Sequence, residues 1–284
     1  MSRILSLLLC TAFIGCERAP APAILKAPEV TTYEVKGVLQ EVLGDGRKAV
    51  IAHEKIPGYM AAMTMQFEAA SAADLGGLAP GDVLAFRLSV TETHSSIDRV
   101  RKLGHTTPTP RVATGEGLPP GTPLPDCELT NSRGQTLQLS SFKGRALAFT
   151  FIFTRCPLPD YCPRMNRNLG AVQSALASDP ATNWHLLSLS FDPDYDTPER
   201  LAKYAEPYQP DPAHWTFATG RAEDVRALGT AFGLAFSNTG TPQDHNLRTL
   251  VVDAVGRVQK VFIGNEWKAD ELTAEMRKAM TAQP

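Results

Sequence analysis

The chain has 284 residues, of which 43% are hydrophobic and 20% charged, so it can bury at least one sizeable core and is not dominated by disorder. Lysine plus arginine number 28 against 30 aspartates plus glutamates, a net charge of −2. No block of basic residues is present to follow a phosphate backbone, so nucleic acid is not an expected partner.

The N-terminus has the pattern of an export signal. A short basic start is followed by an apolar stretch at 4–14 and by Gly15 and Cys16, which is the order of regions in a secretory signal. The sequence Phe-Ile-Gly-Cys at 13–16 resembles a bacterial lipobox, with phenylalanine in place of the usual leucine. We expect 1–15 to be a lipoprotein signal peptide and Cys16 to be lipidated. The alternatives are an ordinary signal peptide cut nearby, or a buried apolar helix.

Residues 16–30 contain three prolines and are predicted to form an extended tether to the membrane. The expected location is the bacterial cell envelope, facing the periplasm or the outer surface. Thiols exported from the cytoplasm are paired, metal-bound, lipidated or redox-active when they have a clear role. With Cys10 removed and Cys16 lipidated, the cysteines at 127, 156 and 162 remain to be explained.

Proline also marks a boundary in the middle of the chain. Six of the 21 residues from 105 to 125 are proline, so we interpret 105–122 as a linker. It separates 31–104 from 123–284, and each segment is long enough to fold as a domain.

Short strands are predicted in the first domain from apolar alternation and β-forming residues. Glycine-containing turns at 44–46 and 80–82 separate some of them. Five short strands in this length predict a small all-β barrel, closed or partly open. The expected strands are 33–43, 48–53, 63–67, 83–90 and 97–103.

Methionines cluster in this domain. Three of the six expected in the mature chain, Met60, Met63 and Met65, fall within six residues. Met63 and Met65 leave the same face of a strand, and the loop from His53 can bring an imidazole over that face. Two thioethers and an imidazole form a soft neutral ligand set that favours Cu(I) or Ag(I). The alternative is that the methionines fill an irregular core and His53 lies on the surface.

This segment resembles the CusF-like periplasmic copper-binding domains, which are OB-type barrels. The resemblance implies copper ligation by His53, Met63 and Met65. In that family a tryptophan packs over the ion, but no tryptophan lies in this domain. Met60 occupies the corresponding position and Tyr59 is its neighbour, so a third thioether or a tyrosine face would complete the site.

Strands and helices alternate in the second domain. A βαβ unit followed by a ββα unit predicts an α/β thioredoxin-like fold. The expected strands are 146–153, 184–191, 215–218, 247–253 and 257–263, and the expected helices are 163–177, 198–204, a segment around 225–232, and 269–280.

Cys156 and Cys162 follow the first of these strands, with five residues between them. Pro163 suits the first turn of a helix, which would place Cys162 where the helix dipole and free amides stabilise a thiolate. A static disulfide closing the loop is the alternative. His245 precedes a later strand, in a loop expected to abut the cysteines. Two thiolates and one imidazole can hold Cu(I), and the same sulfurs can cycle between dithiol and disulfide.

The second domain resembles the SCO/SenC family of copper chaperones. The resemblance is carried by Leu-Pro-Asp-Cys-Glu-Leu-Thr from 124, Phe-Lys-Gly-Arg from 142, Phe-Ile-Phe-Thr-Arg-Cys-Pro from 151, the acidic segment 191–199, and His245. It implies copper ligation by Cys156, Cys162 and His245, and help in copper delivery to cytochrome oxidase. The family's cysteines are usually three residues apart, so the longer loop here is a departure.

The resemblance also gives expectations for neighbouring residues. Asp192 and Asp196 match an acidic segment near the metal and are expected to tune the site without ligating it. Cys127 is expected to be a buried small hydrophobe. The other histidines are interpreted as structural or solvated, and Trp184, Trp215 and Trp267 as core or near-core residues.

The leading hypothesis is a membrane-anchored, exported copper chaperone. Its first domain would capture Cu(I), and its second would receive or deliver copper, as Cu(I) or as Cu(II), to a cytochrome c oxidase subunit or another copper-accepting protein. One alternative is a thiol-disulfide oxidoreductase that reduces the cysteines of such a protein, in which Cys156 and Cys162 are the redox-active pair. The other is a binding protein that buffers or senses copper.

Overall fold

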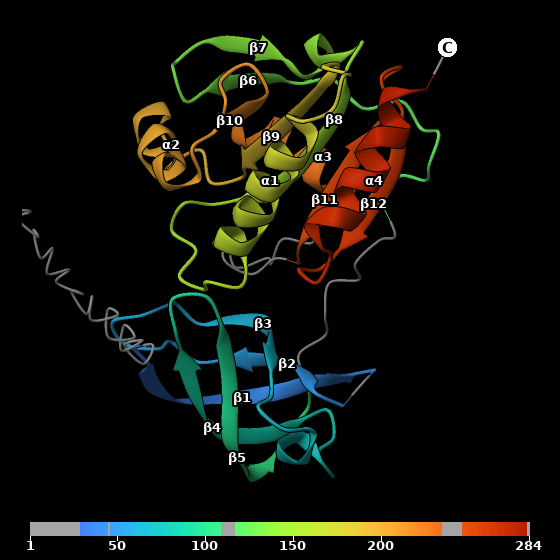
Figure 1. The fold of residues 1–284 in the computed structure, drawn as a ribbon. Helices are drawn as coiled ribbons and strands as arrows, with labels where there is room; N and C mark the ends of the chain where they lie inside the picture. The colour runs from blue at the N-terminus through green and yellow to red at the C-terminus, as the bar shows by residue number, and fades with distance from the viewer. Residues whose placement is uncertain (1–28, 45, 109–116, 235–245, 283–284) are drawn as a thin grey trace, which may run out of the picture.

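The computed structural model describes residues 29–44, 46–108, 117–234 and 246–282. They form two bodies, each built on one β-sheet (Figure 1). The predicted signal peptide and its lipidation site at Cys16 lie outside the described residues. In the described part of the chain, none of the helices combines the length and apolar character needed to cross a membrane.

The first body is a five-stranded antiparallel sheet of order β3-β2-β1-β4-β5. Its edges meet where Ala69, just after β3, pairs with Ile97 in β5 and the Ala70 amide donates to the Ile97 carbonyl. This closure makes the sheet the expected OB-like barrel, around a core that includes Leu39, Ile51 and Phe86. The strands are β1 Thr31–Leu43, β2 Lys48–His53, β3 Met63–Glu68, β4 Asp82–Val90 and β5 Ser95–His105, with a short 3₁₀ turn at Ala72–Leu75.

The second body has a seven-stranded mixed sheet of order β12-β11-β8-β9-β10-β6-β7. The central strands β8, β9 and β10 are parallel, and their buried faces explain the continuous apolar runs. The strands are β6 Glu128–Asn131, β7 Thr136–Gln138, β8 Ala146–Ile152, β9 Trp184–Ser190, β10 Trp215–Gly220, β11 Arg248–Val252 and β12 Val258–Ile263.

Helices cover this sheet and complete the thioredoxin-like fold. Helices α1 and α4 pack together over the central strands, and the N-terminal end of α1 faces the barrel (Figure 1). The helices are α1 Cys162–Leu176, α2 Pro198–Ala205, α3 Ala222–Ala231 and α4 Ala269–Met280, with 3₁₀ turns at Leu139–Phe142 and Glu206–Tyr208. The three tryptophans are buried, as predicted. The β6–β7 hairpin was not predicted, because its strands are short and only partly buried.

His185 in β9 is a buried structural histidine. Arg145 donates to its Nδ1 across 3.3 Å, so Nε2 carries the hydrogen and donates to Thr216 Oγ1 at 2.9 Å. Burial, reinforced by the Arg145 charge, lowers the pKa of His185 to about 3. The ring is therefore neutral in the folded chain at any pH above that value.

This depressed pKa predicts an acid-sensitive second body. The unfolded chain binds a proton at His185 below about pH 6.5, whereas the folded chain does not. The free energy of unfolding is therefore unaffected by His185 above that pH and decreases as the pH drops toward 3. At pH 5 we expect a loss of about 2 kcal/mol relative to pH 7.5. Urea unfolding followed by tryptophan fluorescence measures it, because all three tryptophans lie in this body. His185→Gln should remove most of the pH dependence and His94→Gln should retain it; equal slopes in both variants would contradict the assignment.

Candidate metal centres

The barrel places an imidazole and two thioethers on neighbouring strands. In the antiparallel pairing of β2 with β3, His53 lies directly opposite Met63, and Met65 lies opposite Ile51. Residues opposite one another share a face of the sheet, so His53, Met63 and Met65 are on one face. Gly37 of β1 lies opposite His53 on the other side, where a Cβ would come within 2.7 Å of the Ala52 carbonyl oxygen. The strands therefore pack closely around the histidine.

His53 has the protonation state of a metal ligand. Its side chain is 3% exposed, and its Nδ1 lies 2.7 Å from the Glu54 carbonyl oxygen. A carbonyl only accepts, so Nδ1 carries the hydrogen and Nε2 has a free lone pair. Burial lowers the pKa of His53, so the ring stays neutral. Nε2 is buried without a hydrogen-bond partner, and such an orphaned acceptor beside thioethers fits a soft metal ion.

Met60 lies in the loop between β2 and β3, where it forms an isolated bridge with Ile56. Its side chain is 7% exposed and packs in the barrel core together with Met65, and Met63 packs against that core. Tyr59 is held in another way, because its ring stacks on Tyr33 at 4.5 Å. Of the two expected capping residues, Met60 is thus a buried thioether and Tyr59 has one ring face covered.

The cysteine pair lies at the turn from β8 into α1. Cys156 is partly exposed, Cys162 is fully buried, and both are free thiols. Burial would raise the pKa of Cys156, but hydrogen bonds with the Cys162 side chain and backbone, and with the Leu158 backbone, lower it below its usual value. Burial raises the pKa of Cys162 well above the usual range, and the neighbouring Cys156 raises it further.

The pKa of Cys156 is thus lowered and that of Cys162 raised, although Cys162 is the cysteine that begins α1. The backbone amide of Cys162, at the start of α1, donates a hydrogen bond to the Cys156 sulfur. The N-terminus of the helix therefore stabilises the thiolate form of Cys156. Cys127 was expected to be buried, but it is only half-buried, where it packs against the core. Burial raises the pKa of its thiol to about 11.

The difference between the thiols predicts selective alkylation. The thiolate is the reactive form, so Cys156 is expected to react with iodoacetamide at pH 7 well before Cys127 or Cys162. Its rate should fall only as the pH drops below its lowered pKa. Peptide mass spectrometry of the reduced chain gives each rate separately. Faster modification of Cys162 would contradict the assignment.

Two acidic side chains hold the segment that leads to Cys156. Asp196 accepts hydrogen bonds from the amide and hydroxyl of Thr154, and Asp192 accepts two from Arg155. Both aspartates are buried. They fix the backbone just before Cys156, which gives a physical reason for an acidic segment that tunes this turn.

The remaining predicted ligand, His245, lies outside the described residues. Within the part of the chain that the structure describes, no three His, Cys, Asp or Glu side chains are grouped closely enough to hold a metal ion by themselves. The thioethers of the barrel are not among those residue types.

Sequence reasoning missed the contacts of the residues between the cysteines. Leu158 is 3% exposed and packs in the core of the barrel. Asp160 and Tyr161 make hydrogen bonds to barrel residues. The only signal in the sequence was the unusual length of the loop.

An OB-like barrel with an imidazole–thioether set, joined to a thioredoxin-like body with a cysteine pair at a strand-to-helix turn, defines a two-domain protein of soft-metal and thiol chemistry. The SCO1/SenC family model matches residues 122–281, and the model for the copper binding periplasmic protein CusF matches 32–102. The chain belongs to the SCO1/SenC family and carries a CusF-like N-terminal domain.

Individual relatives agree with this assignment. The chain is 28% identical to a SCO1 protein homolog of Bacillus subtilis over 156 residues, which are 53% of this chain and 79% of the relative. It is 30% identical to a putative copper-binding protein of Stutzerimonas stutzeri over 119 residues, 42% of this chain and 56% of the relative. The crystal structure of a SCO1/SenC family lipoprotein from Bacillus anthracis, 24% identical, superposes with a TM-score of 0.51 over 56% of this chain and 95% of that one, a likeness of fold.

Proposed function

We propose that this protein is an exported copper chaperone that binds Cu(I) at two sites. The observation that carries the proposal is the neutral, unpartnered Nε2 of His53, buried on the strand face that also holds Met63 and Met65. Leaving a buried acceptor unpaired costs about 1–3 kcal/mol, and a metal ion bound to that atom would offset this cost. The likeness to CusF and to a putative copper-binding protein supports copper as the ligand.

The second proposed site consists of Cys156, Cys162 and His245. The lowered pKa of Cys156 favours its thiolate form, and thiolates and imidazoles are ligands for Cu(I). The same site would accept Cu(II) as well. Membership of the SCO1/SenC family supports delivery of this copper to a cytochrome c oxidase subunit or another copper-accepting protein.

The proposed location is the bacterial cell envelope, with Cys16 lipidated and the body facing the periplasm or outer surface. The relatives support this placement, because one matching model describes a periplasmic protein and one similar structure is of a lipoprotein.

A specific observation favours a second candidate function, thiol-disulfide exchange. One thiol with a lowered pKa beside one with a raised pKa is the arrangement of an attacking and a resolving cysteine. In this alternative Cys156 and Cys162 reduce a copper-accepting protein, and His245 is dispensable. A copper buffer or sensor would bind the metal without either delivery or thiol exchange.

Metal stoichiometry tests the proposal. The reduced chain should bind two Cu(I) ions per molecule in competition with a Cu(I) chelator. Met63→Leu with Met65→Leu should leave one ion, held by the cysteines, and Cys156→Ser with Cys162→Ser should leave one, held by the barrel. Absence of Cu(I) from the wild-type chain would refute the proposal.

The capping residue is tested separately. Met60→Leu keeps the apolar volume and removes the sulfur, so we expect weaker Cu(I) binding at the barrel, by roughly tenfold if the thioether completes the site. Chelator competition on a Cys156→Ser, Cys162→Ser background measures it, with Met276→Leu in α4 as the matched control. An affinity unchanged from that control would leave Tyr59 as the cap.

A further inference from the structure

The five residues between the cysteines, 157–161, lie between the two bodies; we call this segment the cysteine loop. Leu158 is 3% exposed and belongs to the apolar core of the barrel, although its chain neighbours belong to the thioredoxin-like body. Burial of a leucine side chain stabilises the contact by removing apolar surface from water. The loop is therefore anchored in the barrel by an apolar side chain.

Three sets of hydrogen bonds join the cysteine loop to the barrel. The Tyr59 hydroxyl donates to the Pro157 carbonyl at 3.0 Å, and the Tyr161 hydroxyl donates to the Gln66 carbonyl at 2.6 Å. The Ser95 hydroxyl donates to the Asp160 carboxylate, with oxygen distances of 2.8 and 3.1 Å. Ser95 and Asp160 are both buried, so these bonds are shielded from water.

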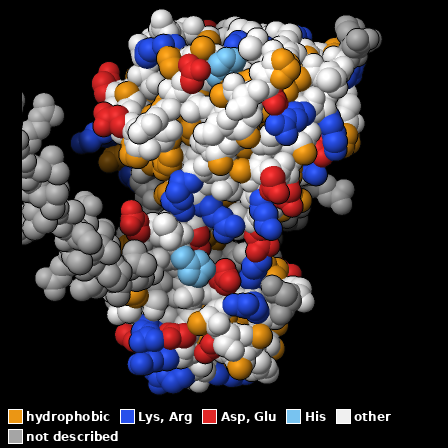
Figure 2. Space-filling model, in the orientation of Figure 1, with side chains coloured by type: hydrophobic (Ala, Val, Ile, Leu, Met, Phe, Trp, Pro, Cys, Tyr) orange, Lys and Arg blue, Asp and Glu red, His pale blue; other side chains and the backbone are white. Residues whose placement is uncertain are grey.

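The same loop is fixed to its own body. The Asn265 amide donates to the Asp160 carbonyl at 2.8 Å, and Arg167 donates to the Pro159 carbonyl at 2.7 Å. An ion pair between Lys48 and Glu266 lies beside this junction. Figure 2 shows the molecule narrowing between the bodies, with side chains of both charges along the waist. The loop is thus hydrogen-bonded to its own body and inserts Leu158 into the other.

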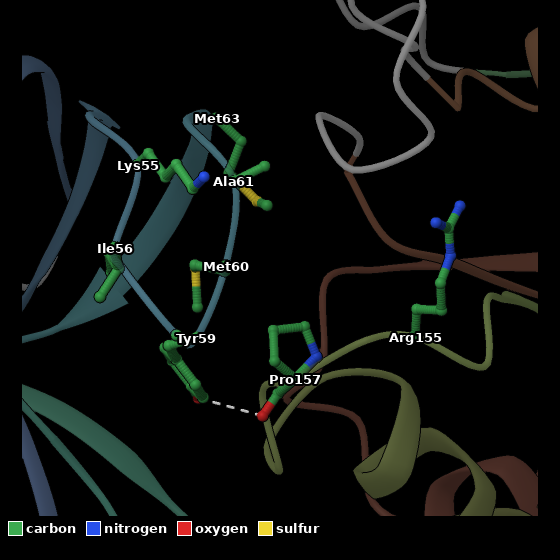
Figure 3. A pocket seen from close by; sticks show the side chains of 9 residues that line it. Lys55, Ile56, Tyr59, Met60, Ala61, Met63, Arg155 and Pro157 are labelled. Carbon is green, nitrogen blue, oxygen red and sulfur yellow. Dashed lines mark hydrogen bonds between the residues drawn. The ribbon is translucent and has the colours of Figure 1, made fainter.

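This insertion brings the two candidate sites together. The partly buried Cys156 packs against the cores of both bodies. A pocket of about 280 Å³ lies between them, with Met60 and Met63 on the barrel side and with Arg155 and Pro157, the neighbours of Cys156, on the other (Figure 3). Two thioethers of the first site thus lie at the same junction as Cys156, whose chain neighbours line the pocket and whose side chain packs against the barrel core.

We propose that the cysteine loop is a docking element that places Cys156 beside the pocket lined by Met60 and Met63, the methionine pocket. Cu(I) then passes from the barrel to the cysteine pair inside one chain. The inference rests on the proposed function and adds the route and direction of transfer. In the step, a bond forms between Cu(I) and Cys156 Sγ and a copper–thioether bond breaks. Any thiol proton leaves to solvent, and copper stays Cu(I). An anionic thiolate holds the cation more strongly than a neutral thioether, so copper moves toward the cysteines.

Docking gives the transfer a kinetic advantage. A tethered site has an effective concentration in the mM range, which can exceed the concentration of the protein itself by orders of magnitude. Transfer inside the chain is then independent of protein concentration, whereas transfer between chains is not. The same contact covers part of Cys156, which packs against the barrel core.

The test uses the full reduced chain and Cu(I) from a chelator complex. Stopped-flow absorption at the Cu(I)–thiolate band reports arrival at the cysteines. Leu158→Asn, with Ser95→Ala as a milder variant, should slow arrival by about tenfold or more and make it depend on protein concentration. The matched controls, Leu103→Asn on the exposed surface and Ser96→Ala on the next position of β5, should transfer as wild type.

Cu(I) binding measured at equilibrium distinguishes failure of the docking proposal from failure of the proposed function. If the docking variants keep both Cu(I) sites but transfer at the wild-type rate, the docking proposal is wrong and the proposed function stands. If the wild-type chain binds no Cu(I), the proposed function itself fails. Circular dichroism identifies a misfolded Leu158→Asn chain, and Ser95→Ala then decides, since it removes one hydroxyl and leaves the backbone unchanged.

Discussion

His245→Ala is expected to abolish stable Cu(I) binding at the cysteine pair while leaving Cys156 and Cys162 able to form a reversible disulfide. Two sulfurs and one imidazole complete a three-coordinate copper site, whereas dithiol exchange needs only the sulfurs. Loss of an outer-shell partner of a metal ligand costs 10–100-fold in affinity. We therefore expect at least about a 100-fold loss when the ligand itself is removed.

This substitution separates the chaperone from the reductase. Chelator competition measures copper, thiol titration after oxidation and reduction measures the disulfide, and oxidase activity in cells reports copper loading. His94→Ala, which removes a histidine from a barrel loop, is the control and should behave as wild type. If oxidase assembly proceeds in His245→Ala cells but stops in Cys156→Ser cells, metal transfer is the wrong function and thiol reduction is the one to pursue.

The sequence was sufficient for most of the fold. The barrel strands stand out because alternating residues pack inward, as Met65 and Phe67 do in β3, and the structure matches the predicted strand limits closely. The parallel strands β8 and β9 are buried on both faces and appear as continuous apolar runs. The β6–β7 hairpin was not predicted, because Thr136–Gln138 is too short to show a periodic pattern of apolar residues.

The candidate sites were predicted less completely, for a physical reason. The two-residue spacing of Met63 and Met65 determines which strand face they share, so a local pattern revealed it. Which cysteine has the lowered pKa depends on the hydrogen bonds that Cys156 makes with Cys162 and Leu158, and these are a property of the folded turn. The contact of Leu158 with the barrel joins segments far apart in the chain, and no local pattern encodes it.

Because the two proposed sites lie in one chain, variants at a single site should be interpreted differently. If Cys156 receives copper through the methionine pocket, loss of the barrel ligands should slow loading of the cysteines without weakening their affinity at equilibrium. Rates and affinities would then respond to different residues, Leu158 controlling the first and His245 the second. A chain whose sites act independently would show no such separation.

His53→Leu is expected to remove Cu(I) from the barrel and, at the same time, to make the metal-free barrel more stable. The buried Nε2 of His53 has no partner, and replacing an unsatisfied polar atom by an apolar group of similar size recovers part of its desolvation penalty, about 1 kcal/mol. His105→Leu in β5 should do the opposite, because His105 Nδ1 pairs with the buried Asp82 carboxylate at 3.0 Å and that carboxylate would lose a partner. Hydrogen exchange of the β2 and β3 amides measures barrel stability without interference from the second body, and chelator competition measures copper. Slower exchange together with lost copper binding would identify His53 as a residue kept for its ligand at the expense of the fold, whereas faster exchange with copper binding intact would make it a structural histidine and remove the first site from the proposed function.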